Sequence, residues 1–149
     1  MTENDLNGIT GYFENKYLNP VPKLKYGSAY QLLVAVVLSA QCTDERVNKV
    51  TERLFVNYGT PEKMLELSQA ELENYIFSCG LYHMKAEHIL SASSDIVQKY
   101  GGKVPDTLAE LQKLSGVGRK TANVVYSVAF SGNAIAVDTH VFRVANRLG

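Results

Sequence analysis

The sequence predicts an all-α protein, built as a helical bundle. Apolar residues recur every three or four positions along most of the 149 residues. Serine and threonine stand just before several of these periodic segments, where their side chains can cap the first turn of a helix. No stretch alternates between apolar and polar residues as a half-buried strand would, so we expect no sheet.

A central helix comes first in the main bundle. The run 32–38 reads Leu-Leu-Val-Ala-Val-Val-Leu and is apolar on every side, which is typical of a helix that others surround. The next periodic segment follows Thr43, which can act as its N-cap, and has a single apolar face. That face is formed by Val47, Val50, Leu54 and Tyr58.

Start signals mark the later helices. Thr60 precedes Pro61, a residue favoured at the first helical position, and Ser68 stands three residues before Glu71 as in a capping box. A long helix then presents one apolar face, formed by Ala86, Ile89, Leu90, Ile96, Val97 and Tyr100.

We expect these helices to be organised in two domains. Residues 22–132 form the helical-bundle domain. Residues 1–21 together with 133–149 form part of a second helical domain, which is incomplete. The segment 19–22, Asn-Pro-Val-Pro, marks the change from one to the other.

Composition limits the class of protein without indicating a partner. Fifteen Lys and Arg balance fifteen Asp and Glu, so any nucleic-acid site must come from a local arrangement of charge. The N-terminus lacks the pattern of a signal peptide, and no apolar run is long enough to cross a bilayer. We therefore expect a cytoplasmic monomer that does not bind membranes.

The two cysteines, Cys42 and Cys79, are widely separated in the sequence. They form no Cys-x-x-Cys pair, which argues against a disulfide framework, and two thiolates cannot supply a four-thiolate metal site. We expect both thiols to be reduced, and we expect no metal site in this chain.

A turn with two glycines is the first candidate site. It joins a short helix, with cap signals at Thr107 and Glu110, to a second helix, and this helix-hairpin-helix motif covers residues 108–130. Gly116 and Gly118 permit positive φ and close approach of the backbone to a ligand, while the N–H groups that open the second helix face outward. Such a turn can bind a DNA phosphate without reading sequence, although a bare Gly-x-Gly is more often a turn that binds nothing.

Lys120 follows this turn at the start of the second helix. The positive end of the helix dipole and the neighbouring Arg119 both disfavour an ammonium ion there, which makes the lysine easier to deprotonate. A neutral amine is a nucleophile that can form Schiff bases. The alternative is a solvated cation that only adds to phosphate attraction, and the residues alone leave both interpretations open.

Asp138 is the second candidate catalytic residue. It stands after an irregular stretch, at the N-cap position of another helix, where backbone N–H groups hold a carboxylate ionised and fixed in direction. Such a group suits the balancing of positive charge on a sugar or the acceptance of a nearby proton. The alternative is a helix cap with no further role.

Four sequence segments, spread in order over nearly the whole chain, carry a family resemblance. They are Ser39-Ala-Gln-Cys-Thr-Asp44, Gly80-Leu-Tyr82 with Lys85, Gly116-Val-Gly-Arg-Lys-Thr-Ala-Asn-Val-Val125 and Ala136-Val-Asp-Thr-His-Val-Phe-Arg-Val144. Together they resemble the endonuclease III family, which comprises DNA glycosylase/AP lyases of the helix-hairpin-helix superfamily. The resemblance implies the HhH-GPD-like fold of DNA glycosylases.

The resemblance also implies roles for individual residues. Lys120 corresponds to the family's nucleophile and Asp138 to its catalytic aspartate. Gln41 and Leu81 correspond to side chains that enter the duplex when the damaged nucleotide is turned out. Further DNA contacts are expected from Gly116, Val117, Gly118, Arg119, Thr121, His140 and Arg143.

The activity implied by the resemblance is base excision repair by a bifunctional enzyme. Its partner is double-stranded DNA that contains oxidised pyrimidines or abasic sites. The enzyme removes the base through a Schiff base on Lys120 and then nicks the strand by β-elimination.

Two features depart from the family pattern. Ser115 stands in the hairpin where the family commonly has proline, which loosens the turn but leaves its N–H donors in place. The family also continues beyond the position of Gly149 to four cysteines that bind a [4Fe–4S] cluster. We therefore expect no cofactor in this chain, and a cluster only where that cysteine segment is present.

Two other functions remain open at this point. One is a non-catalytic helix-hairpin-helix fragment that binds DNA and has lost turnover. The other is a relative of the adenine glycosylases, a branch that lacks lysine at this hairpin position, so that Lys120 counts against it.

Overall fold

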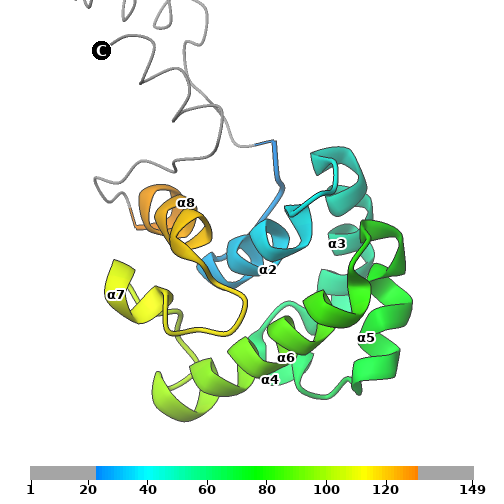
Figure 1. The fold of residues 1–149 in the computed structure, drawn as a ribbon. Coiled ribbons are helices and arrows are strands. Elements are labelled where there is room, and N and C mark those ends of the chain that lie inside the picture. Colours follow the sequence, from blue (N-terminus) through cyan, green and yellow to red (C-terminus); the bar gives the residue numbers. More distant parts are fainter. Residues whose placement is uncertain (1–22, 131–149) are drawn as a thin grey trace, which may run out of the picture. The chain divides into compact units, whose positions relative to one another are not determined.

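The computed structural model describes residues 23–130, and all the regular structure in this range is helical (Figure 1). The chain divides into two compact units, residues 23–136 and residues 1–22 with 137–149, and the described residues all belong to the first. The described part confirms the all-α prediction. None of its helices is long and apolar enough to cross a membrane.

Helix α2 (Ala29–Ser39) lies at the centre of the bundle, as its all-round apolar sequence predicts. It packs against α3, α6 and α8, which surround it in Figure 1. Ser28 caps it by accepting a hydrogen bond from the N–H of Gln31 at 3.1 Å. The Tyr30 hydroxyl lies 2.7 Å from that of Ser93 on α6, so the polar atoms of the core are paired.

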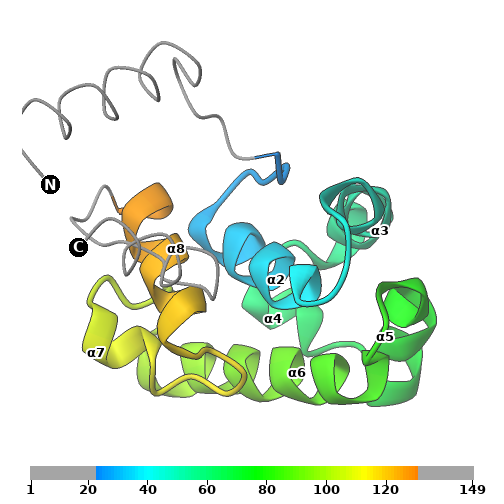
Figure 2. The same cartoon turned by 45° about the horizontal axis from the view of Figure 1, so that its top comes forward.

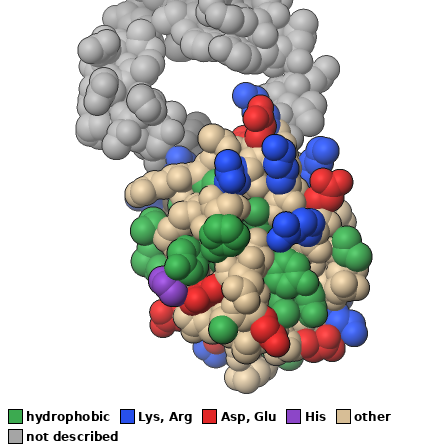
Figure 3. Space-filling model, turned by 90° about the vertical axis from the view of Figure 1, so that its right-hand side faces the viewer, with side chains coloured by type: hydrophobic (Ala, Val, Ile, Leu, Met, Phe, Trp, Pro, Cys, Tyr) green, Lys and Arg blue, Asp and Glu red, His purple; other side chains and the backbone are tan. Residues whose placement is uncertain are grey.

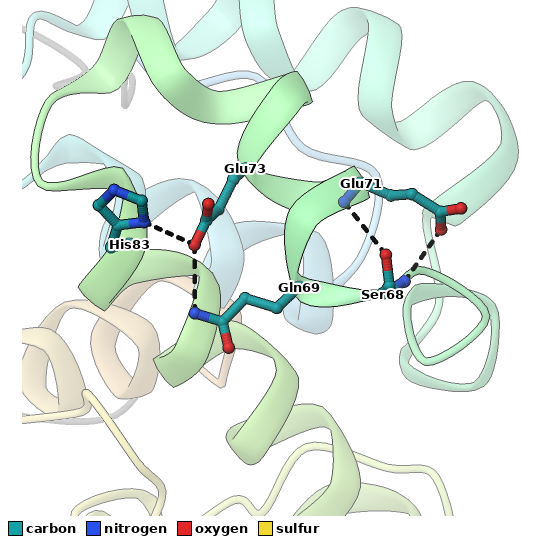
Figure 4. A network of polar contacts seen from close by, with 5 residues as sticks. All are labelled: Ser68, Gln69, Glu71, Glu73 and His83. Carbon is teal, nitrogen blue, oxygen red and sulfur yellow. Dashed lines mark hydrogen bonds and ion pairs between the residues drawn. The ribbon is translucent and has the colours of Figure 1, made fainter.

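Three further helices begin at the residues that the sequence indicates. Thr43 caps α3 (Asp44–Tyr58), Thr60 caps the short α4 (Pro61–Met64), and Ser68 caps α5 (Gln69–Ile76). The cap at Ser68 is a complete capping box (Figure 4). Besides the cap bond of the Ser68 side chain, the Glu71 carboxylate accepts a hydrogen bond from the Ser68 N–H at 2.9 Å. These local contacts fix where each helix starts.

A short 3-10 helix, η1 (Phe77–Cys79), leads into the long helix α6 (Tyr82–Lys99). Glu73 on α5 and His83 on α6 join the two helices, with 2.8 Å between Oε1 and Nδ1, and Gln69 donates to the same carboxylate (Figure 4). The His83 contact is the largest cause that lowers the pKa of Glu73. Helix α6 then runs under the rest of the bundle in Figure 2, where it packs against α2, α4 and α5.

The hairpin consists of α7 (Leu108–Leu111), a turn and α8 (Arg119–Ala129). Figure 2 shows the turn passing along α6 before α8 rises away from it. Thr107 caps α7, but Glu110 does not complete the expected capping box, because its carboxylate accepts from Tyr100 and Lys113 instead. The apolar residues that anchor the motif in the core are Leu111, Leu114, Val117, Ala122 and Val125.

Candidate functional site

The hairpin turn is held against α6 through Gly116. This residue has a φ of +73°, in the left-handed region that favours glycine. A Cβ atom at this position would lie 2.6 Å from the Cβ atom of His88, so no larger residue fits without movement of α6. Gly116 is therefore needed for the conformation and the packing of the turn.

Gly118 has a different role from Gly116. Its φ of −81° and ψ of −177° are open to any residue, and a Cβ atom there would meet none of the described residues within 4 Å. It is the N-cap of α8, and as a glycine it has no side chain with which to cap the helix. The exposed start of α8 can therefore accept an anionic group close to the backbone.

Val117 does not fit the direct DNA contact expected from the sequence. Its side chain is 5% exposed and belongs to the core. Its N–H donates to the carbonyl oxygen of Leu114 at 3.1 Å. Val117 therefore fixes the shape of the turn from inside rather than offering a donor.

The first turn of α8 carries the predicted nucleophile. Arg119 and Lys120 are exposed and Thr121 is half-buried. Arg119 and Lys120 stand at the positive end of the helix dipole, and this first turn contains no acidic residue. The structure thus places Lys120 on the surface beside Gly118. Its role as a nucleophile stays a prediction.

Gln41 and Leu81 are exposed residues on two separate loops. Gln41 follows α2 and has a φ of +54°, and Leu81 precedes α6 and has a φ of +50°. These are the only non-glycine residues with positive φ in the range 23–130. Leu81 is 48% exposed despite its apolar side chain. Two strained, exposed residues on neighbouring loops are typical of a functional site.

Helix α6 relates the Leu81 loop to the hairpin. Leu81 is its N-cap and His88 lies about two turns further on, so both fall on similar sides of the helix about 10 Å apart along its axis. Gly116 rests on His88. The Leu81 loop and the hairpin that carries Lys120 therefore lie along one edge of α6. Asp138, His140 and Arg143, which the sequence also indicates, lie outside the described residues.

Lys85 has a buried ammonium group that was not predicted from the sequence. Its side chain is 2% exposed, although it is a lysine in the first turn of α6. The signal was present in the sequence, because Lys85 directly precedes the inward-facing Ala86 and stands four residues before Ile89. Its Nζ atom donates to the carbonyl oxygens of Leu38, Ala40 and Cys79 at 2.9, 2.6 and 2.8 Å.

A cationic groove lies on the side of α3 and α5, which faces the viewer in Figure 3. Arg46, Lys49 and Arg53 line it, because spacings of three and four residues place them on one side of α3. Tyr75 and the largely exposed Phe77 complete its wall. The chain has no net charge, yet the lining of this groove contains three basic residues and no acidic one.

The described residues offer no metal centre. None of their His, Cys, Asp and Glu side chains form a group of three or more that could hold an ion. The whole sequence contains two cysteines, whereas a four-thiolate [4Fe–4S] cluster needs four. The residues present therefore do not fit such a cluster.

Comparisons with known proteins find similarity to base excision DNA repair proteins. A family model described as HhH-GPD superfamily base excision DNA repair protein matches residues 34–149. Endonuclease III of Haemophilus influenzae is 50% identical over 129 residues, which are 87% of this chain and 61% of that protein. Endonuclease III of Rickettsia conorii is 49% identical over 144 residues, which are 97% of this chain and 69% of that protein.

A solved structure of a trapped covalent intermediate of endonuclease III with DNA has a TM-score of 0.92 and 48% sequence identity. The alignment covers 100% of this chain and 70% of the chain in that solved structure. The chain thus spans about two thirds of the length of these relatives, and 61% of the Haemophilus protein. Because the family model covers most of the chain and about half of the aligned residues are identical, the chain belongs to the HhH-GPD superfamily of base excision DNA repair proteins and, within it, to the endonuclease III family.

Proposed function

We propose that this protein is a DNA glycosylase with AP lyase activity, acting on oxidised pyrimidines and abasic sites in double-stranded DNA. The observation that carries the proposal is the exposed, uncapped start of α8, where Lys120 stands beside Gly118. Its relatives support it, since an endonuclease III with a TM-score of 0.92 to this chain has been trapped covalently on DNA.

Recognition begins with the backbone of the hairpin. A phosphate of the damaged strand binds at the open N-terminus of α8, where a helix dipole favours an anion and no sequence is read. The missing Cβ atom of Gly118 lets the phosphate approach the backbone. The damaged nucleotide is then turned out of the stack, because its reacting atom is unreachable inside it.

The two exposed loops act on the duplex at the same point. Leu81 enters the stack as an apolar wedge, and Gln41 occupies the gap with an amide that can pair with the opposite base. Both side chains are available for this task because both are exposed. The cationic side of α3 adds attraction to neighbouring phosphates.

The chemistry proposed for Lys120 is covalent. Its neutral amine attacks C1′ of the sugar, the bond from C1′ to the base breaks, and the base leaves with that electron pair and a proton. Opening of the sugar ring gives a protonated Schiff base between Nζ and C1′. Loss of a C2′ proton then drives β-elimination, which breaks the C3′–O bond and nicks the strand on the 3′ side. Asp138 is the proposed carboxylate that balances positive charge on the sugar.

Borohydride trapping on an abasic-site duplex tests this proposal. Reduction of the Schiff base links the protein permanently to DNA, so we expect a covalent product and a nicked strand. Lys120→Gln removes both and keeps measurable DNA binding, because the backbone donors of the hairpin remain. Lys113→Gln, which changes an exposed lysine before the turn, serves as the matched control and keeps both. Undiminished nicking by Lys120→Gln would overturn the assignment of the nucleophile.

The same experiment separates the other functions. A non-catalytic DNA-binding fragment and an adenine-glycosylase relative would both bind the abasic duplex without a trapped product. A duplex with a mismatched adenine then distinguishes these two, because only the adenine-glycosylase relative releases adenine. We propose that the protein works as a monomer on chromosomal DNA in the cytoplasm of a bacterium, as its bacterial relatives suggest.

A further inference from the structure

The ammonium group of Lys85 is buried and fully hydrogen-bonded. An ammonium has three protons, and each is donated to one main-chain carbonyl oxygen, those of Leu38, Ala40 and Cys79. Burying a charge is costly without such partners. The first turn of α6 is also the wrong end of a helix for a cation, since the helix dipole is positive there. The three carbonyls must therefore offset both effects.

Among the residues 23–130 that the structure describes, no carboxylate acts on this cation. Burial lowers the pKa of the Lys85 amine, and the thiols of Cys79 and Cys42 act in the opposite direction. The buried ammonium group therefore does not form an ion pair. Its three hydrogen bonds join one side chain to the backbone of two other segments.

Those two segments are the loops that carry Gln41 and Leu81. Ala40 immediately precedes Gln41, and Cys79 stands two residues before Leu81. Both loops place a non-glycine residue in the left-handed region, at φ values of +54° and +50°. Such a conformation persists only where the surroundings hold it. Lys85 bonds to both loops at the point where each enters that conformation.

We propose that Lys85 is a positioning residue, which holds the Gln41 and Leu81 loops together in the arrangement that enters the duplex. This inference rests on the proposed function. It predicts that Lys85 matters where the stack must be opened and matters little where there is no stack. Lys85 itself does not touch DNA, because its side chain is buried.

Strand nicking on two abasic substrates tests the inference, one a duplex and the other the same strand alone. Lys85→Met removes the three donors and keeps an unbranched chain. We expect it to lower nicking of the duplex about tenfold or more, while nicking of the single strand changes little. Lys99→Met, at the exposed opposite end of α6, is the matched control and should change neither. An equal loss on both substrates would mean that Lys85 only supports the fold, and would overturn the inference.

A second measurement keeps the inference testable if Lys85→Met does not fold. Lys85→Arg retains charge and donors but changes their geometry. It should therefore keep only part of the fluorescence rise that the unaltered protein produces in 2-aminopurine placed opposite the abasic site, and it should lower the ratio of duplex to single-strand nicking. In a background with Gln41→Ala and Leu81→Ala, the ratio of duplex to single-strand nicking should no longer respond to Lys85→Arg. A full response in that background would contradict action through the two loops.

The outcome for Lys85 is distinguishable from the outcome for the proposed function. If the unaltered chain nicks neither substrate, or if Lys120→Gln still nicks them, the proposed function fails. If the unaltered chain nicks both and Lys85→Met retains the original ratio, only the positioning role fails.

Discussion

Gly116 and His88 touch at a point where the hairpin leaves no room for a side chain. The missing Cβ atom would stand 2.6 Å from the Cβ atom and 2.7 Å from the Cγ atom of the histidine. Because the Cβ atom of His88 is fixed to the backbone of α6, the clash cannot be relieved by a change of rotamer alone. A residue larger than glycine at this position would therefore force the hairpin away from the long helix.

Gly116→Ala should therefore lower the free energy of unfolding by about 2–3 kcal/mol, from positive φ and overpacking together. Denaturant unfolding measures the loss. Gly101→Ala is the matched control, since Gly101 also has a positive φ, +62°, but has nothing within 4 Å of its missing Cβ atom. It should cost about 1 kcal/mol, from φ alone. Equal losses for the two variants would show that the contact with His88 adds nothing.

Gly118→Ala should separate binding from folding. The backbone at Gly118 suits any residue and the space beside it is open, so the free energy of unfolding should change by less than about 0.5 kcal/mol. If a phosphate approaches there, the added methyl group weakens DNA binding without any change in charge. Fluorescence anisotropy with an abasic duplex measures the affinity. Unchanged affinity would remove Gly118 from the interface.

The cationic side of α3 should contribute to the salt dependence of DNA binding. Each substitution among Arg46→Gln, Lys49→Gln and Arg53→Gln should reduce the slope of log affinity against log salt by about 0.9, if the residue neutralises one phosphate. Binding measured at several salt concentrations gives the slope. Lys63→Gln, on α4, removes one positive charge away from this groove and should leave the slope as it is. Equal changes for all four variants would indicate a general charge effect.

Acid should weaken the junction between α5 and α6 through Glu73. The hydrogen bond from His83 holds the pKa of this carboxyl below its ordinary value. A lowered pKa means that the contribution to stability is present above the ordinary carboxyl pKa and is lost as the pH falls through the lowered value. His83→Ala should raise the pKa of Glu73 toward the ordinary value, as an NMR titration of its carboxyl carbon measures.

Gln69→Ala tests the same site by removing the smaller contribution to the lowered pKa of Glu73, the hydrogen bond from the amide. The pKa of Glu73 should therefore rise less in this variant than in His83→Ala. A larger rise in Gln69→Ala would contradict the order of the two causes.

Helix starts were predictable from sequence because they depend on neighbours in the chain. Thr43, Thr60 and Ser68 cap the helices that follow them, as expected, and the apolar run 32–38 lies in the central helix. Each cap bond links residues three apart, so a single short window of sequence contains both partners. The Glu110 carboxylate is the exception, because Lys113 and Tyr100, the latter ten residues away, donate to it instead.

The features that shape the candidate site depend on distant partners, and the sequence did not reveal them. The positive φ of Gln41 and Leu81 has no local signal, since neither is glycine or asparagine. The bond from Lys85 to Leu38 spans 47 residues, and the contact between Gly116 and His88 joins segments that only the folded bundle brings together. Val117 was expected to contact DNA, and its burial likewise depends on the folded bundle rather than on its neighbours in the chain.

The three bonds of Lys85 end on main-chain oxygens, and every residue type supplies such an oxygen. Substitutions at positions 38, 40 and 79 therefore keep the acceptors, provided that the new side chains fit. The side chains at positions 41 and 81 can likewise change without loss of the bonds that hold their loops. The side chains that are proposed to enter the duplex can therefore change during evolution while the backbone of their loops stays in place. The chemical groups of the site and the structure that positions them can vary independently.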